Sequence, residues 1–264
     1  MASTMAWAKS FRRFLRLLLP LAFWLGVWQL AGWLVERSVS GRGNELLLPY
    51  PATVFKALAG LVVTAAFWRS VAASLLRIFA GLAVGVAAGS VLAALTGASR
   101  TLYWLLAPAI RVIRATPVAS FILLVLLWTG RDAVPVIVSA LMVVPVVWET
   151  MAQGIAATDK KLLEMARVYR FSKWKTLRLI YLPSIRPYFS AALTNAVGLA
   201  WKSGSAAEVL CLPKQALGSR IYQAKLYLEI PELFAWTVTV VCLSSCLEKL
   251  LTLALRRQKG GGHQ

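Results

Sequence analysis

The chain has 264 residues, of which 59% are hydrophobic and 15% are charged, and its formal net charge is +19. A soluble domain needs a more charged surface, so this composition excludes an ordinary soluble protein and predicts segments that face lipid. A single histidine and three cysteines without a CxxC pair argue against zinc sites and histidine-based catalysis, and we expect no metal site.

The first apolar runs predict two membrane spans with an outer helix between them. Basic residues precede the run 17–35, which indicates an uncleaved span with residues 1–16 in the cytoplasm. The segment 46–58 predicts an amphipathic helix on the outer interface. The second span, 71–95, carries glycines at intervals of four, a spacing that predicts a face for close helix contact: Gly81, Gly85 and Gly89.

The third apolar run, 102–130, is interrupted by proline and by charge. Pro108 and Pro117 break helical hydrogen bonding, while Arg111 and Arg114 place charge among apolar residues. We expect a helix near the cytoplasmic interface up to Arg114, then a bend, then a span from about Pro117. The two arginines either line a cytoplasm-facing exit or anchor the interfacial helix to lipid phosphates.

A basic segment follows the fourth span, 134–148. Residues 160–183 carry seven basic side chains and one acid, and they lie between apolar runs that are too long for loops. A basic, helix-patterned insert between two spans indicates a cytoplasmic docking element. In this insert, Glu164-Met165-Ala166 is followed after three residues by Arg170, and after nine more by Ile180-x-Leu182-Pro183.

The last two spans are 188–207 and 233–255, with an outer loop over 208–232. Six spans place both termini, including the tail 256–264, and the loop 155–183 on one side of the membrane. This side carries most of the excess positive charge, so the charge orients the protein in the bilayer and does not indicate nucleic acid. The predicted fold is an all-α polytopic membrane protein with a single transmembrane domain over 17–255.

Polar side chains inside the spans are the candidates for a translocation pathway, because a charge at a helix centre costs about 2.5–3.5 kcal/mol. Lys202 lies late in the fifth span. It either faces the central pathway and attracts an anionic or polar solute, or extends to the outer interface, or pairs with Glu208. The pathway candidates are Arg111, Arg114, Asn195, Trp201, Lys202 and Glu208.

The docking segment resembles the cytoplasmic E-A-A loop of ABC-importer permeases, whose pattern is E-A-A, three residues, G, nine residues and I-x-L-P. Met165 replaces the second residue of this pattern and Arg170 replaces the glycine, which in the family lets the chain turn between two short coupling helices. Five positions match in register: Glu164, Ala166, Ile180, Leu182 and Pro183. Three further segments resemble the nitrate, taurine and alkanesulfonate branch: L-P-x-P after the first span, R-x-x-P at 114–117, and A-W…A-A-E at 200–208.

The resemblance implies the permease subunit of a type I ABC importer in a bacterial inner membrane. It implies a homodimer of this chain, two copies of a separate cytoplasmic ATPase, and an extracytoplasmic solute-binding protein. The ATPase would bind ATP and magnesium, so this chain, which lacks a G-x-x-x-x-G-K-[ST] loop, would need no cofactor and catalyse no reaction. The solute would be small and anionic or polar, like a sulfonate, taurine or nitrate.

The implied coupling residues lie on both sides of the turn at Arg170. The resemblance implies that two short helices enter a groove of the ATPase, with apolar contacts inside the groove and basic residues at its rim. The expected apolar contacts are Leu163, Ala166, Trp174 and Leu177. The implied coupling residues are Glu164, Met165, Ala166, Arg170, Trp174, Ile180, Leu182 and Pro183.

The residues alone leave two other classes of protein to consider. An ATP-independent secondary transporter or channel would use Lys202 and Glu208 as coupling charges, although no internal repeat typical of many such transporters is visible. An intramembrane enzyme is disfavoured, because the spans lack a catalytic histidine and paired acids.

Overall fold

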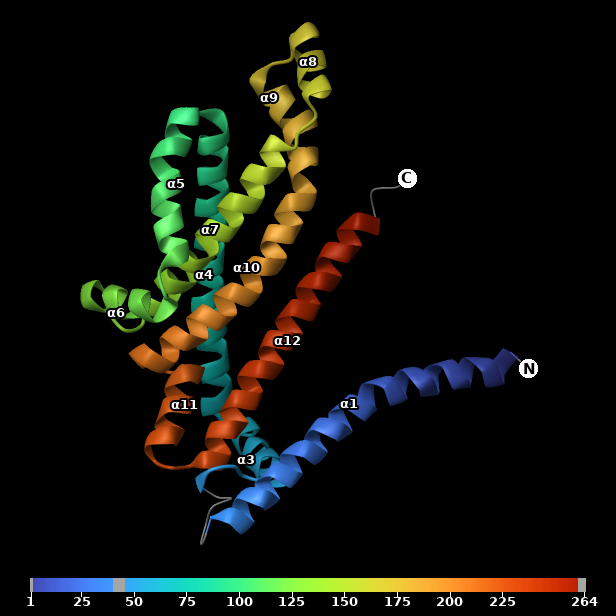
Figure 1. The fold of residues 1–264 in the computed structure, drawn as a ribbon, viewed down its shortest axis with the longest axis vertical. Coiled ribbons are helices and arrows are strands. Elements are labelled where there is room, and N and C mark those ends of the chain that lie inside the picture. The colour runs from blue at the N-terminus through green and yellow to red at the C-terminus, as the bar shows by residue number, and fades with distance from the viewer. Residues whose placement is uncertain (1, 40–45, 261–264) are drawn as a thin grey trace. The chain divides into compact units, whose positions relative to one another are not determined.

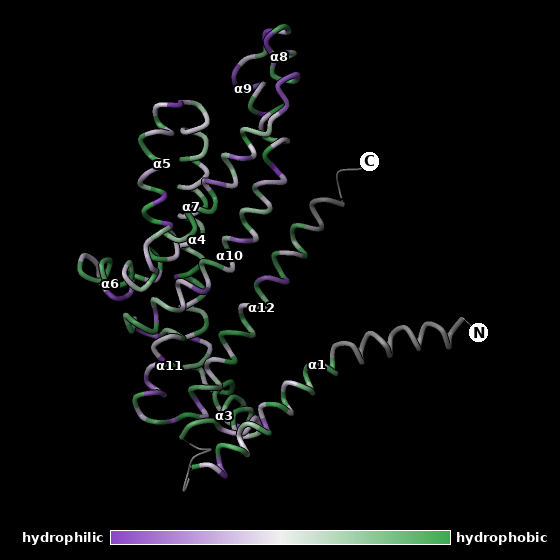
Figure 2. The backbone as a smooth tube through the Cα atoms, in the orientation of Figure 1, coloured by the Kyte–Doolittle hydropathy of each residue, from purple (hydrophilic) through white to green (hydrophobic). Residues whose placement is uncertain are grey.

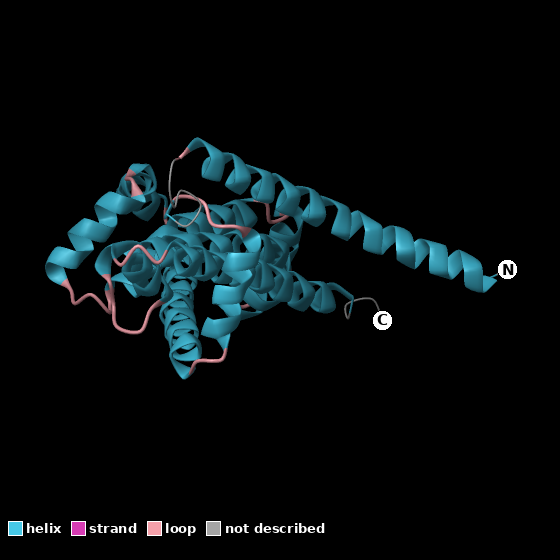
Figure 3. Ribbon diagram, turned by 90° about the horizontal axis from the view of Figure 1, so that it is seen from below, coloured by secondary structure: helices cyan, strands magenta, loops and turns pink. Residues whose placement is uncertain are grey.

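The computed structural model describes residues 2–39 and 46–260. Within these ranges the regular elements are helices and no strand occurs (Figure 1, Figure 3), which confirms the all-α fold class. The chain divides into two compact units, which we describe separately. The first contains the described parts of 1–67 together with 221–238, and the second contains 68–220 together with 239–260.

The first unit contains α1 (Ala2–Ser38) and α3 (Pro51–Val62). α3 begins with proline, which is favourable in the first turn because no backbone hydrogen bond is lost there. The indole Nε1 of Trp28 donates a hydrogen bond to the Pro49 carbonyl at 3.1 Å, so the residues before α3 are held against α1. The Tyr50 hydroxyl donates to the Glu36 carboxylate, and this bond is the main reason why the pKa of Tyr50 is raised. The helix predicted at 46–58 forms, but it begins later, at Pro51. Its place at the membrane interface stays a prediction.

The second unit is built on three long helices, α4 (Ala65–Ala98), α7 (Val134–Ala156) and α10 (Leu182–Cys211). The predicted glycine face of α4 packs closely on α7. A β-carbon at Gly85 would lie 2.7 Å from Cβ of Val143, and one at Gly89 would lie 2.8 Å from Cβ of Val147. The prediction of a helix contact face is confirmed.

α10 also packs on α7, where small residues allow the two backbones to approach. Ala192, Ala196 and Ala200 of α10 are fully buried. A β-carbon at Gly204 would lie 2.6 Å from Oγ of Ser139, and 2.7 Å from Cγ1 of Ile78 on α4. The three helices therefore meet at Gly204.

The third apolar run forms two helices, α5 (Arg100–Ala115) and α6 (Val118–Trp128), with a bend of 106° between them. The extended backbone of Thr116 and Pro117 ends α5 and begins α6, which confirms the predicted break. α6 has 11 residues and is about 16 Å long, well short of the roughly 30 Å of a bilayer core. The prediction of a full span from Pro117 is therefore wrong, although α5 and α6 together have the composition of one broken span.

Four helices in the described ranges are long and apolar enough to cross a membrane, and the bent pair is a fifth candidate. The four segments are Leu18–Ser38, Ala65–Ala98, Val134–Ala156 and Ile230–Leu255, the last of which belongs to α12 (Ile230–Gly260). α10 has 30 residues, or about 45 Å, but it is not among them. The predicted count of six spans, which includes α10, therefore stays a prediction.

The predicted outer loop over 208–232 contains a further helix, α11 (Leu217–Leu226). α10 also runs beyond the predicted end of its span, to Cys211. Leu212 then takes a left-handed conformation with φ 52°, and its amide donates to the Glu208 carbonyl at 3.0 Å. This bond ends α10 in the manner of a left-handed cap.

Candidate functional site

The basic insert forms two short helices, α8 (Lys160–Val168) and α9 (Lys173–Thr176), beyond the ends of α7 and α10 (Figure 1). Each begins with a side-chain cap. The Asp159 carboxylate accepts a hydrogen bond from the Lys161 amide at 2.8 Å, and the Ser172 hydroxyl accepts one from the Lys175 amide at 3.2 Å. Figure 2 colours much of this segment as hydrophilic. The structure therefore confirms two short helices on either side of residue 170.

Arg170 turns the chain between these helices in a left-handed conformation, with φ 50°. The Phe171 amide donates to the Ala166 carbonyl at 2.8 Å and the Arg170 amide donates to the Arg167 carbonyl at 3.0 Å. These two bonds are the Schellman pattern that ends many helices. Arg170 thus adopts the conformation that glycine would supply in the E-A-A loop, at a cost of about 1–2 kcal/mol for a residue with a side chain.

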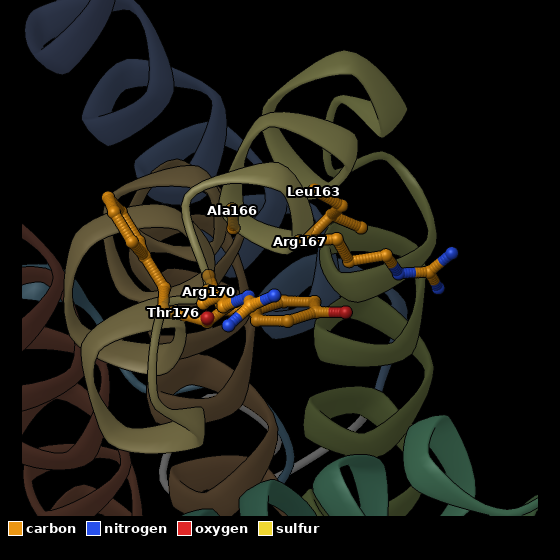
Figure 4. A pocket seen from close by; sticks show the side chains of 7 residues that line it. Leu163, Ala166, Arg167, Arg170 and Thr176 are labelled. Atoms are coloured by element: carbon orange, nitrogen blue, oxygen red, sulfur yellow. The ribbon is translucent and has the colours of Figure 1, made fainter.

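A pocket of about 320 Å³ lies between α8 and the segment that follows the turn (Figure 4). Leu163 and the buried Ala166 line it from α8, so both face the interior of the loop. These two were expected to be surface contacts; a partner would reach them only with a side chain that enters this pocket. The Lys175 Nζ lies 4.3 Å from the ring centroid of Phe171, a cation–π contact that supports the turn. The lining is Leu163, Ala166, Arg167, Arg170, Phe171, Thr176 and Tyr181.

The outer side of the insert exposes large apolar side chains. Val168 is 78% exposed, Tyr169 is 70% exposed and Trp174 is 71% exposed, and they lie outside the predicted spans, so an exposed group of this kind suits a partner protein. We define the docking face as Leu162, Met165, Val168, Tyr169 and Trp174. Sequence reasoning missed Leu162, Val168 and Tyr169, although they lie three or four residues from Met165, the spacing of neighbours on one helix surface.

A π-helix, η1 (Leu177–Tyr181), connects α9 directly to α10. Ile180 is 4% exposed within it and Leu182 is 62% exposed where α10 begins. Of the I-x-L-P residues, Ile180 therefore packs inward, whereas Leu182 and Pro183 lie on the surface. π-helices are rare and are frequently found at functional sites, and no residue pattern in the sequence predicts this one.

One side of α10, with its alanines, is buried, and another side is exposed and polar. Thr194, Asn195 and Lys202 are exposed, and Asn195 and Lys202 are seven residues apart, so they lie two turns apart on the same side. The Ser205 hydroxyl near them is buried without a hydrogen-bond partner in the described part of the chain. We define the polar face as Thr194, Asn195, Gly198, Lys202 and Ser205. A lipid-facing surface is apolar, so this face suits a hydrated pathway better than lipid.

Trp201 and Glu208 lie away from the polar face, in the interior. Trp201 is 2% exposed, and its Nε1 donates to the Val240 carbonyl of α12 at 3.3 Å. Glu208 is fully buried and accepts hydrogen bonds from the Ser74 hydroxyl at 2.7 Å and the Gly218 amide at 3.2 Å. The ion pair considered between Lys202 and Glu208 is not formed, because the Glu208 carboxylate lies among these buried groups.

Arg111 and Arg114 line a groove of about 470 Å³ between α5 and α7. Arg114 forms an ion pair with Glu149 of α7, and the Arg111 Nε donates to the Ala107 carbonyl at 3.3 Å. Glu149 is a partner that sequence reasoning did not foresee. The groove is compatible with both predicted roles, a pathway exit and an anchor for lipid phosphates.

A second acid near the polar face was also missed in the sequence. Oε1 of Glu248, on α12, lies 3.4 Å from the position that a β-carbon at Gly198 would take. Glu248 follows two exposed cysteines on the same helix, Cys242 and Cys246. Across the described ranges, no three His, Cys, Asp or Glu side chains gather in a way that could hold a metal ion.

Comparisons with known proteins agree with this geometry. Residues 85–258 match the family described as the binding-protein-dependent transport system inner membrane component. The chain is 31% identical to the bicarbonate transport system permease protein CmpB of Synechococcus elongatus, over 79% of this chain and 77% of that protein. It is 25% identical to the putative aliphatic sulfonates transport permease protein SsuC of Bacillus subtilis, over 91% and 85% of the two chains. The fold is also similar to a chain in the crystal structure of a bacterial ABC transporter that imports alginate, with a TM-score of 0.64, 16% identity, and coverage of 95% and 98%.

Proposed function

The chain belongs to the family of binding-protein-dependent transport system inner membrane components, and from that premise we propose that its docking face binds an ATPase while its polar face conducts a small anion. It is an ABC-importer permease of the nitrate, taurine and sulfonate branch. The ATP-independent transporter or channel finds no support in these relationships.

The observation that carries the proposal is the shape of the insert after α7. Two capped helices and a left-handed turn at Arg170 expose the apolar docking face in a segment that also carries seven basic side chains. An apolar centre with a charged rim is typical of a protein interface. Because η1 joins α9 to α10 without a loop, a rigid-body displacement of the docking face would move α10.

The assembly that we propose follows the family's mode of action. Two copies of this chain form the membrane part, each bound to one cytoplasmic ATPase, with ATP and magnesium held by the ATPase. A solute-binding protein delivers the solute from the opposite side of a bacterial inner membrane. The positive charge of the insert supports a cytoplasmic docking face, and with it cytoplasmic termini.

For the solute we propose a small oxyanion, such as a sulfonate or bicarbonate. The relatives named for aliphatic sulfonates and for bicarbonate carry anions of this class. In this chain the exposed Lys202 supplies a positive charge on the polar face, beside hydrogen-bonding groups of Thr194 and Asn195. An exposed ammonium on this face would attract a small anion, although the Glu248 carboxylate also lies near Gly198.

Co-purification of the ATPase tests the docking face. Replacing Val168 and Tyr169 together by serine removes two exposed apolar contacts, so we expect the ATPase to be lost from the tagged chain during gentle detergent extraction. Val63→Ser is the matched control, because Val63 is 84% exposed but lies at the end of α3. Both variants should keep the wild-type thermal unfolding temperature, since neither change affects a buried residue.

Two outcomes contradict this proposal. Full retention of the ATPase by the double variant removes the docking face from the interface. Uptake that persists in membranes depleted of ATP rejects the coupled mechanism and restores the secondary transporter.

A further inference from the structure

A second large groove of about 800 Å³ lies in the second unit, beside the start of α10. Its walls come from α4, α7, η1, α10 and α12. Most of the lining is apolar, with Phe189 and Leu193 along one side of α10 and Leu255 from α12. The lining residues are Ser90, Met151, Arg178, Leu182, Pro183, Ile185, Arg186, Phe189, Ser190, Leu193 and Leu255.

Two arginines give this apolar groove a positive end. Arg178 and Arg186 are both exposed, and neither forms an ion pair within the described ranges. Two unpaired guanidinium groups, each with several N–H donors, are suited to an anionic group with several acceptor oxygens.

The apolar part of the groove extends away from the arginines along α10. Arg186, Phe189 and Leu193 follow one another at three and four residues, so they form one stripe on the helix. From Arg186 to Leu193 the stripe rises by about 10 Å, which is long enough to contact a segment of an acyl chain. The groove therefore has a charged end and a long apolar wall.

We propose that this groove binds an anionic phospholipid, with its phosphate at Arg178 and Arg186 and one acyl chain along Phe189 and Leu193. The inference rests on the proposed orientation, in which the start of α10 lies at the cytoplasmic face of the membrane. Basic pockets between spans on that face bind anionic headgroups. A small hydrophilic anion would leave the apolar wall without a partner, and a zwitterionic lipid would offer less charge to two cations.

The position of the groove gives the lipid a defined role. Arg178 belongs to η1, the element that connects the docking face to α10, and Arg186 lies two turns further along. A phosphate that contacts both arginines would bridge η1 and the first turns of α10. Bound lipid would therefore stiffen the connection through which the ATPase moves this helix.

Native mass spectrometry of the purified permease, mixed with phosphatidylglycerol or with phosphatidylcholine, tests the proposal. We expect phosphatidylglycerol to be retained in preference to phosphatidylcholine. Arg178→Gln combined with Arg186→Gln should weaken phosphatidylglycerol binding about thirtyfold, or about fivefold for each charge. Arg100→Gln is the control, because Arg100 is exposed at the start of α5 and does not line the groove. Leu193→Trp should also reduce retention by filling the apolar wall without changing the charge.

The outcomes separate this inference from the proposed function. Equal retention of both lipids, or equal phosphatidylglycerol retention by the double variant and the control, overturns the lipid site. The lipid site is also overturned if the purified permease is a dimer that retains no phospholipid, because the second permease chain then occupies the groove. The ATPase co-purification is independent of this readout, so the docking face can stand when the lipid site fails.

Discussion

The hydroxyl of Ser74 donates a 2.7 Å hydrogen bond to the carboxylate of Glu208, although 134 residues separate them in the chain. The Leu217 amide in turn donates to the Ser74 Oγ at 2.9 Å, and the Gly218 amide donates to Glu208 at 3.2 Å. Three segments therefore meet at one buried carboxylate: α4, α10 and the start of α11. Glu208 acts here as the acceptor that satisfies these buried donors.

We predict that Glu208→Ala destabilises the permease without a direct effect on the pathway. The substitution leaves the Ser74 hydroxyl and the Gly218 amide without their acceptor, and each lost partner costs about 1–3 kcal/mol. Thermal unfolding in detergent should show a clear fall in midpoint, with a smaller fall for Glu208→Gln because the amide oxygen still accepts. Glu229→Ala, at an exposed acid, should leave the midpoint unchanged. An unchanged midpoint for Glu208→Ala, accompanied by loss of uptake, would instead place Glu208 in the pathway.

The role of Glu208 illustrates what the sequence cannot reveal. A charge near a span predicts a functional residue on average, but its actual partners, Ser74 and Gly218, come from distant segments. The helices themselves were predictable, because apolar runs and prolines determine where spans form and break. The angle at Thr116–Pro117 depends on how α5 and α6 pack, so the sequence predicted a bend but not the short α6.

In the insert that carries the docking face, the sequence again predicts the helices but not which side chains are exposed. The resemblance of the segment around Arg170 to the E-A-A loop implied two helices and a turn, and helix-patterned residues are a local signal. Whether a side chain is exposed depends on segments that are distant in the sequence. Ala166 matches the E-A-A pattern yet is buried, whereas Val168 and Tyr169 match nothing and are exposed. Which apolar residues face outward is decided by the packing of α8 on the segment after the turn, and this packing is visible only in the structure.

The contact between α4 and α7 should be sensitive to a single methyl group. We predict that Gly85→Ala destabilises the fold by about 1–3 kcal/mol, because the new β-carbon would lie 2.7 Å from Cβ of Val143 and 2.8 Å from the Ala140 carbonyl oxygen. Gly60→Ala is the matched control, since nothing lies within 4 Å of its β-carbon position in α3. That control should be neutral or should stabilise by up to about 1 kcal/mol through helix propensity. Equal unfolding midpoints for the two variants would show that α4 and α7 are not tightly packed at Gly85.

The turn at Arg170 should depend on its backbone conformation more than on its charge. Arg170→Gly and Arg170→Asn both suit φ 50°, so we expect the ATPase to be retained in co-purification with each. Arg170→Val disfavours that conformation, and we expect the Phe171 amide to exchange faster with solvent and the ATPase to be retained less. If the asparagine and valine variants lose the ATPase equally, the Arg170 guanidinium contacts the ATPase directly, and the conformation of the turn does not determine binding.

Lys202 provides the sharpest test of the polar face. A hydrogen bond to a charged group contributes about 1.5–3 kcal/mol, so Lys202→Gln should lower the uptake rate of a labelled sulfonate or of bicarbonate at low concentration by about tenfold to a hundredfold. Lys202→Glu should abolish this uptake, because a negative charge repels the anion, whereas Lys202→Arg should retain much of it. Lys202 is exposed, so none of these variants should change the unfolding midpoint or the amount of co-purified ATPase. Lys56→Gln, an exposed lysine on α3, is the control for a change in surface charge. Uptake that is unaffected by Lys202→Glu would show that the ammonium extends to the membrane interface and takes no part in conducting the solute.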